Sequence, residues 1–187
     1  MHGDETSIQV LKEPGREPTS TSYMWLYRTG RDSPPIVLYD YQTGRSGKHA
    51  ASFLEGFKGY LHVDGYAGYH SIPEVTLCGC WSHARRGFTD ALKALPSGKR
   101  EGKVLTDEAI AYCDKLFRIE RSLNELPPEE RLEKRKAESA PVLEDFKAWL
   151  IKYAPLVTPK SALGKAIAYC RNQWPKLVIA HVQDEFR

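Results

Sequence analysis

The sequence has no long hydrophobic run and little net charge, and both absences restrict what the protein can be. Its 187 residues contain no stretch of about 18 apolar residues, so we expect no transmembrane helix and no membrane partner. The first residues show no charged leader followed by an apolar stretch, which predicts a soluble, cytoplasmic protein. A net charge of +3 does not by itself predict binding to nucleic acid. Any basic binding surface must therefore be local.

Cysteines are also few: Cys78, Cys80, Cys113 and Cys170. Without a secretory signal, they are interpreted as reduced thiols and not as a disulfide framework. The spacing of Cys78, Cys80 and His83 could begin a zinc site, but no second Cys or His pair at suitable spacing completes four ligands. Packing is the favoured interpretation, with Cys113 and Cys170 in helix cores.

The hydrophobic content of 41% supports a packed interior, and the residue pattern changes near position 85. Before that point, short β-branched and aromatic runs separated by Gly, Pro and Ser predict five strands, at residues 7–11, 23–28, 36–41, 60–63 and 75–81. Apolar residues at helical spacing predict a helix at 48–57, which crosses over before the fourth strand. This order predicts a mixed α/β sheet with a parallel crossover.

After position 85 the pattern is helical. One helix is predicted at residues 105–123, and Pro127-Pro128 then interrupts the pattern. A second helix follows the break and ends before Pro155. Thr158-Pro159 has the pattern of an N-cap followed by a first-turn proline, which predicts a third helix to about Trp174. The second half is therefore expected to be a helical block.

Two aspartates lie beside predicted strands. Asp64 closes the fourth strand and precedes a Gly- and Tyr-rich loop, while Asp4 stands in front of the alternating apolar residues Ile8 and Val10. Two such carboxylates from different strands could share divalent ions, which suggests phosphoryl transfer on nucleic acid. Each also has a simpler interpretation, because acids near a chain end are usually only solvated and Asp64-Gly65 could be a hairpin turn.

A short basic group follows the fifth predicted strand: His83, Arg85 and Arg86. If that strand runs parallel to its neighbour, these residues leave the sheet at the same end as Asp64. Arg85 and Arg86 could then bind DNA phosphates, and His83 could contact the scissile phosphate or hold the carboxylates. The alternative is an exposed helix start without a partner.

Three motifs carry a resemblance to a known family: Gly3-Asp4-Glu5-Thr6, the run from His62 to Tyr69, and the run from Cys80 to Phe88. They resemble the central catalytic region of bacterial transposases of the insertion sequence 66 family, and the similarity continues through residues 131–150 and 161–174. The resemblance implies an RNase H-like fold and a triad of two aspartates and a glutamate that holds Mg²⁺ or Mn²⁺. It implies cleavage and strand transfer at transposon ends, with DNA ends and target DNA as partners, no small-molecule substrate, and a homo-oligomer in the full-length protein.

On the matching motifs, Asp4 is the first acid and Asp64 the second. The family places its third acid in an Asn-Asn-x-x-Glu-Arg motif, which this sequence does not contain, and Glu185 lacks the paired asparagines. We therefore expect no third catalytic acid in this chain, and a fragment that is inactive alone. The expected domains are a partial RNase H-like core (1–95), a helical insertion (96–177) and a divergent or truncated tail (178–187).

Two other functions remain open. A stand-alone nuclease of the same fold could use Asp4, Asp64 and another acid such as Asp107 or Glu108. A noncatalytic DNA-binding or regulatory remnant could associate with an intact transposase through the helical block, and it would bind DNA independently of magnesium and of Asp64.

Overall fold

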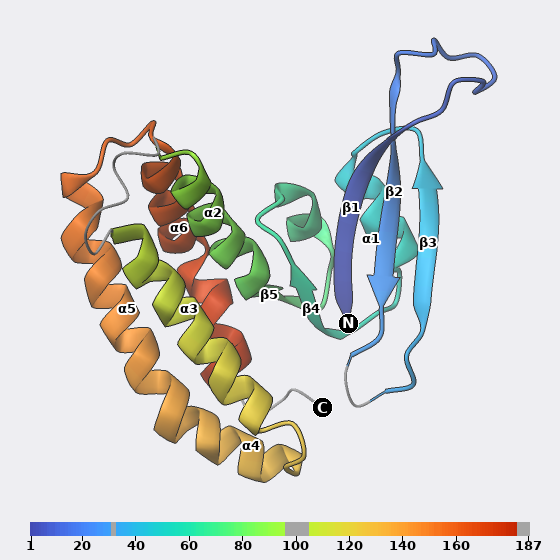
Figure 1. Cartoon of the computed structure of the whole chain (residues 1–187). Helices are drawn as coiled ribbons and strands as arrows, with labels where there is room; N and C mark the ends of the chain where they lie inside the picture. Colours follow the sequence, from blue (N-terminus) through green and yellow to red (C-terminus); the bar gives the residue numbers. More distant parts are fainter. Residues whose placement is uncertain (31–32, 96–104, 183–187) are drawn as a thin grey trace. The chain divides into compact units, whose positions relative to one another are not determined.

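The computed structural model describes residues 1–30, 33–95 and 105–182. By its internal contacts the chain divides into two compact units, Met1–Cys78 and Gly79–Arg187. Strands dominate the first unit and helices the second (Figure 1). The sequence predicts a boundary at residue 95 between the RNase H-like core and the helical insertion of the family. That boundary stays a prediction.

The first unit is built on a five-stranded mixed sheet with the order β3-β2-β1-β4-β5. Its strands are β1 (His2–Gln9), β2 (Thr21–Arg28), β3 (Val37–Gln42), β4 (Gly59–Val63) and β5 (Val75–Gly79). β1, β2 and β3 pair antiparallel, whereas β4 pairs parallel to β1 after the chain has passed through α1 (Gly47–Phe53). The predicted mixed α/β sheet with a parallel crossover is confirmed.

The core of this unit lies between α1 and the sheet. Trp25 and Tyr27 alternate on β2 and are fully buried, as are Leu61 and Val63 on β4. They pack with Ala50 and Leu54 of the α1 segment and with Tyr69 and Ile72 after β4. Burial of these aromatic and branched side chains is the main term that holds the helix against the sheet.

Several strand boundaries in the first unit differ from the prediction, most of all the start of β1. β1 begins at His2 and not at residue 7, so Asp4 lies inside the strand, opposite Leu26 of β2. This stretch is mostly polar, so its side-chain pattern does not predict a strand. Pairing with β2 from His2↔Arg28 to Gln9↔Thr21 satisfies the hydrogen-bonding groups of its backbone. β5 ends at Gly79, and Trp81 already opens a helix.

The second unit is a helical block, as predicted. Its elements are α2 (Trp81–Lys93), α3 (Leu105–Ser122), α4 (Pro128–Lys134), the π-helical turn η3 (Arg135–Ser139), α5 (Ala140–Tyr153), the 3₁₀ turn η4 (Ala154–Leu156) and α6 (Ala162–Val182). Its buried core includes Phe88, Leu116, Phe146 and Leu150 together with Cys113 and Cys170. The interpretation of these two cysteines as helix core is confirmed.

The last helix departs from the prediction at both ends. It begins at Ala162, where Ser161 acts as the cap because its Oγ accepts the Gly164 N–H at 3.0 Å. It also passes through Pro175 and continues to Val182. Packing offsets the cost of the internal proline, since Leu177 is fully buried and its carbonyl accepts the Trp81 Nε1–H at 2.9 Å. Among the described residues, no helix is both long and apolar enough to cross a membrane.

Candidate active site

Strand register brings Asp4 and Asp64 together. β1 and β4 run parallel with His2 opposite His62, and the two imidazole rings stack with centroids 4.7 Å apart. Asp4 lies two positions after His2 in the sequence, and Asp64 lies two positions after His62. Because side chains alternate with a period of two, both carboxylates stand on the same side as the histidine pair and at the same level. The crossover through α1 therefore creates the acidic pair.

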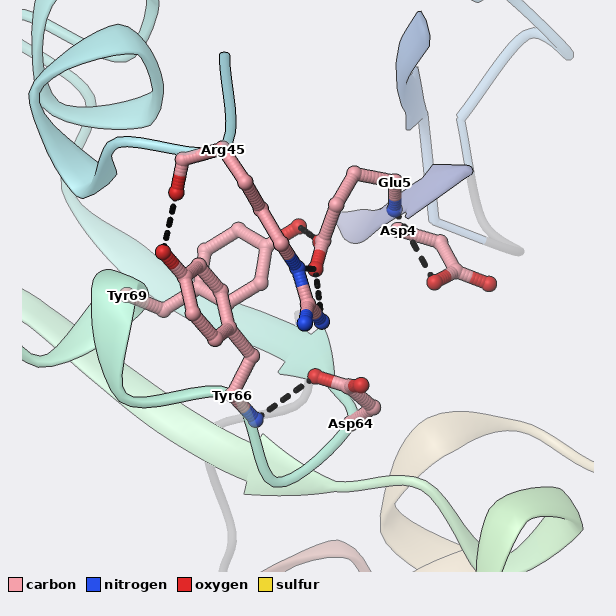
Figure 2. Close-up of polar contacts among 6 residues, drawn as sticks. All are labelled: Asp4, Glu5, Arg45, Asp64, Tyr66 and Tyr69. Atoms are coloured by element: carbon pink, nitrogen blue, oxygen red, sulfur yellow. Dashed lines mark hydrogen bonds and ion pairs between the residues drawn. The ribbon is translucent and has the colours of Figure 1, made fainter. Parts of the chain in front are cut away.

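Backbone N–H groups orient both carboxylates. The Tyr66 N–H donates to Asp64 Oδ1 at 2.8 Å, and the Glu5 N–H donates to Asp4 Oδ1 at 3.0 Å (Figure 2). Oxygens of the two carboxylates lie within 4.8 Å of each other. The hairpin interpretation of Asp64-Gly65 is wrong, because the chain enters the 3₁₀ turn η1 (Ala67–Ser71) before β5 begins. Asp64 instead accepts from the residue two positions later, as in an Asx turn.

The donor set fits a hard divalent cation. Each aspartate uses one oxygen for a backbone N–H, and in the described part of the chain the other oxygen accepts no hydrogen bond. Mg²⁺ and Mn²⁺ prefer carboxylate oxygens and retain several waters, so two oxygens from neighbouring strands can hold such an ion without a complete protein cage. Asp4 is exposed and Asp64 half-buried, which leaves the pair open to a substrate.

A buried polar network lies beside the acidic pair. The Glu5 side chain is only 1% exposed. Its Oε1 accepts the Arg45 Nε–H at 2.8 Å and an Nη2–H at 2.6 Å, and its Oε2 accepts the Tyr69 hydroxyl at 2.7 Å. Burial raises the pKa of Glu5, hydrogen bonds from Tyr69 and Arg45 oppose this, and the Asp64 charge raises it further. Both Glu5 oxygens are thus occupied.

Tyr66 and Tyr69 complete the wall of this network. The Arg45 guanidinium lies over the Tyr66 ring at 4.1 Å from its centroid, and the Tyr66 hydroxyl donates to the Arg45 carbonyl. Burial raises the pKa of Tyr69, so its hydroxyl stays protonated and donates to Glu5. Glu5 and Arg45 were not predicted as site residues. Glu5 stands 40 positions from Arg45 and 64 from Tyr69, so no local pattern connects them.

The predicted basic residues lie on the first turns of α2, in the second unit. Arg85 forms an ion pair with Asp114 of α3, with Nε and Oδ1 2.6 Å apart. Arg86 is exposed, and the described residues provide no ion-pair partner for its guanidinium. His83 forms a side-chain hydrogen bond with Cys80; burial raises the pKa of that thiol, but the bonds and charge of His83 lower it overall.

A cavity of about 630 Å³ is open beside Arg85. Two further arginines of α3, Arg118 and Arg121, also line it. Asp114 pairs with Arg85, and Glu120 pairs with Arg135. The acids of the lining are thus neutralised, which leaves the charges of Arg118 and Arg121 without a paired acid in the described residues.

Comparison with known proteins places the chain among transposases. The model of a family described as "Transposase IS66 family" matches residues 1–185. The uncharacterized protein y4hP of Sinorhizobium fredii is 32% identical over 192 residues, which cover 93% of this chain and 34% of that protein. The uncharacterized protein y4jD of the same organism is 31% identical over 191 residues, covering 95% and 36%. The chain thus spans about a third of the length of these relatives. No solved structure matches it.

Proposed function

The chain belongs to the insertion sequence 66 family of transposases, and on that premise we propose that its first unit contributes two acids to a metal-dependent site for DNA cleavage and strand transfer. Asp4 and Asp64 are the first and second acids of a two-aspartate-plus-glutamate triad. The observation that carries this proposal is their parallel register, which puts oxygens of the two carboxylates within 4.8 Å of each other. The partners are transposon ends and target DNA.

The RNase H-like assignment of the first unit belongs to the same proposal. The sheet order, with three antiparallel strands followed by a helix and a strand parallel to β1, supports it. In such a fold the first two acids stand at adjacent strands, and here Asp4 lies inside β1 and Asp64 directly follows β4. Assembly of the full-length protein into a homo-oligomer is proposed from family membership alone.

The residues of the chain have distinct tasks in this site. Asp4 and Asp64 hold Mg²⁺ or Mn²⁺ through the oxygens that the backbone leaves open, while the N–H groups of Glu5 and Tyr66 fix the two carboxylates in place. A bound divalent ion lowers the pKa of an attacking water or 3′-hydroxyl and stabilises the leaving oxygen of the phosphodiester. The open side of the pair leaves room for the substrate backbone.

We further propose that the chain cuts DNA poorly or not at all when alone. Within the described residues of the first unit, no third carboxylate joins Asp4 and Asp64. Glu5 does not supply it, because Arg45 and Tyr69 occupy both of its oxygens. Two acids bind an ion more weakly than three, and they leave the second metal position with too few protein ligands.

DNA contacts from the second unit are the remaining part of the proposal. Arg86 is the best placed residue, since it is exposed and has no ion-pair partner among the described residues, whereas Arg85 also forms the ion pair with Asp114. His83 is half-buried on the same helix and is proposed as a weaker contact. Backbone contacts of this kind position DNA without reading its sequence.

Calorimetric titration with Mn²⁺ tests the acidic pair. We expect the full chain to bind the ion, and Asp64→Asn and Asp4→Asn each to weaken binding about tenfold or more, because each removes a charged ligand but keeps the side-chain shape. Glu55→Gln is the matched control, an exposed acid of the same unit. Absence of binding in the unsubstituted chain would overturn the catalytic proposal and favour the noncatalytic DNA-binding remnant.

A further inference from the structure

The acidic pair creates an electrostatic problem for a phosphodiester substrate. Asp4 lies in β1 and Asp64 directly follows the neighbouring β4, and the buried Glu5 adds a third negative charge beside them. A phosphate that approaches this group is repelled until cations offset the charge. A positively charged side chain fixed at the same place would reduce that repulsion.

Arg45 supplies such a charge, and its contacts hold it rigidly. Nε and Nη2 both donate to the same Glu5 oxygen, at 2.8 and 2.6 Å, and the ring of Tyr66 supports the guanidinium from one side. The Tyr66 hydroxyl also holds the Arg45 carbonyl. Binding a ligand with a long arginine side chain usually costs rotamer entropy. These contacts already order Arg45 before any ligand binds, so that cost is smaller here.

Arg45 uses only some of the N–H donors of its guanidinium. A guanidinium has five N–H donors, and Glu5 takes one from Nε and one from Nη2. In the described residues, the Nη1 donors have no partner. In Figure 2 the Arg45 side chain passes the Glu5 carboxylate and points toward Asp64, with Tyr66 beside it. The unused donors therefore lie at the end of the side chain that points toward Asp64.

Exposure separates this arrangement from an ordinary buried ion pair. The Glu5 side chain is 1% exposed, but that of Arg45 is 43% exposed. If Arg45 served only to neutralise Glu5, nothing would require its side chain to remain partly exposed. Partial burial lowers the pKa of Arg45, but the charges of Glu5 and Asp64 both raise it, so its guanidinium lies within electrostatic reach of Asp64.

We propose that Arg45 is a substrate-binding residue, whose free guanidinium donors bind a non-bridging oxygen of the DNA phosphate beside Asp64. Glu5 is its positioning residue, and Tyr69 fixes Glu5 in turn. The inference rests on the proposed function, because it assumes that Asp4 and Asp64 hold a metal at which a phosphodiester is bound. A planar guanidinium suits a phosphate because it can donate two parallel hydrogen bonds.

Substitution of Arg45 tests the inference through two affinities that should respond differently. In Arg45→Gln we expect Mn²⁺ affinity by calorimetry to stay equal or rise, because a repelling charge has been removed. Affinity for a short DNA duplex, measured by fluorescence anisotropy with Ca²⁺ present, should fall roughly tenfold to a hundredfold. Arg45→Lys should recover part of the loss, since it keeps the charge but not the fork.

A double variant removes the complication of a buried unpaired Glu5. Glu5→Gln combined with Arg45→Gln keeps the net charge of the site and leaves no isolated buried carboxylate. We expect its Mn²⁺ affinity to stay within about threefold of the unsubstituted chain, while its DNA affinity falls as in Arg45→Gln. Circular dichroism verifies that each variant is folded.

These measurements distinguish failure of the inference about Arg45 from failure of the proposed function. If both Arg45→Gln and the double variant lose metal affinity, or if neither loses DNA affinity, Arg45 is a structural clamp and the inference is overturned. If the unsubstituted chain binds no metal, or binds DNA without any dependence on metal, the proposed function fails first and the inference fails with it.

Discussion

At the scale of single residues, the loop that carries Asp64 depends on a close approach between two glycines. A Cβ placed on Gly47 would lie 2.3 Å from the Gly68 carbonyl oxygen and 2.7 Å from its Cα. Gly68 belongs to η1, the turn that also carries Tyr69, and Gly47 opens α1. The missing side chain of Gly47 therefore lets the start of α1 support the segment that follows Asp64.

This contact reverses the usual effect of alanine in a helix. Gly→Ala normally stabilises a helical position by about 0.5–1 kcal/mol. We expect Gly47→Ala instead to lower the free energy of unfolding by about 1–3 kcal/mol, because backbone atoms must move apart. Urea unfolding followed by circular dichroism measures the change. Gly44→Ala is the control, since no atom lies within 4 Å of its Cβ position, and equal stabilities for the two variants would contradict the expectation.

At the scale of elements, α6 places a histidine in the core of the second unit. His181 is 5% exposed and meets the Trp81 ring edge-on, with centroids 5.9 Å apart. Burial lowers the pKa of His181 to about 4, with Glu120 raising it and Arg135 lowering it by smaller amounts. The imidazole is therefore neutral in the folded protein near pH 7.

This burial makes the helical unit sensitive to acid. The folded pKa lies below the unfolded value of 6.5, so protonation favours the unfolded state, and stability falls as the pH drops below about 6.5. We expect His181 to account for a loss of about 2 kcal/mol between pH 7 and pH 5. Urea unfolding at both pH values measures it, and His181→Gln should shrink the difference while His70→Gln, exposed on η1, should not. An unchanged pH dependence in His181→Gln would rule out the histidine as its source.

The elements also show how far the sequence could predict the structure. Hydrophobic periodicity identified the type and order of the strands and helices, because each follows from local side-chain pattern. It failed at the first strand and at the end of α6, where long-range pairing of β1 with β2 and packing of Leu177 outweigh local signals. The acids Asp4 and Asp64 were singled out from their place beside predicted strands and from motif resemblance, whereas Arg45 was missed because only the fold connects it with Glu5.

At the scale of the whole molecule, net charge determines how strongly the chain attracts a polyanion such as DNA at long range. Its 27 basic and 24 acidic residues leave a net charge of only +3, so long-range attraction to a polyanion is weak. The first unit adds an acidic pair that repels phosphates unless metal is bound. The proposed affinity for DNA therefore depends on a few local cations, and in the second unit Arg86 is the residue proposed for this contact.

Salt dependence measures that contribution directly. Each phosphate that a cation neutralises releases condensed counterions, so loss of one contact makes the slope of log K against log salt shallower by about 0.9. We expect Arg86→Gln to show this change, and to weaken binding equally for unrelated duplex sequences, because the contact is to the backbone. Lys147→Gln, an exposed cation on α5, should leave the slope unchanged. If both variants flatten the slope alike, binding is spread over the whole surface; if neither does, α2 does not contact the DNA backbone.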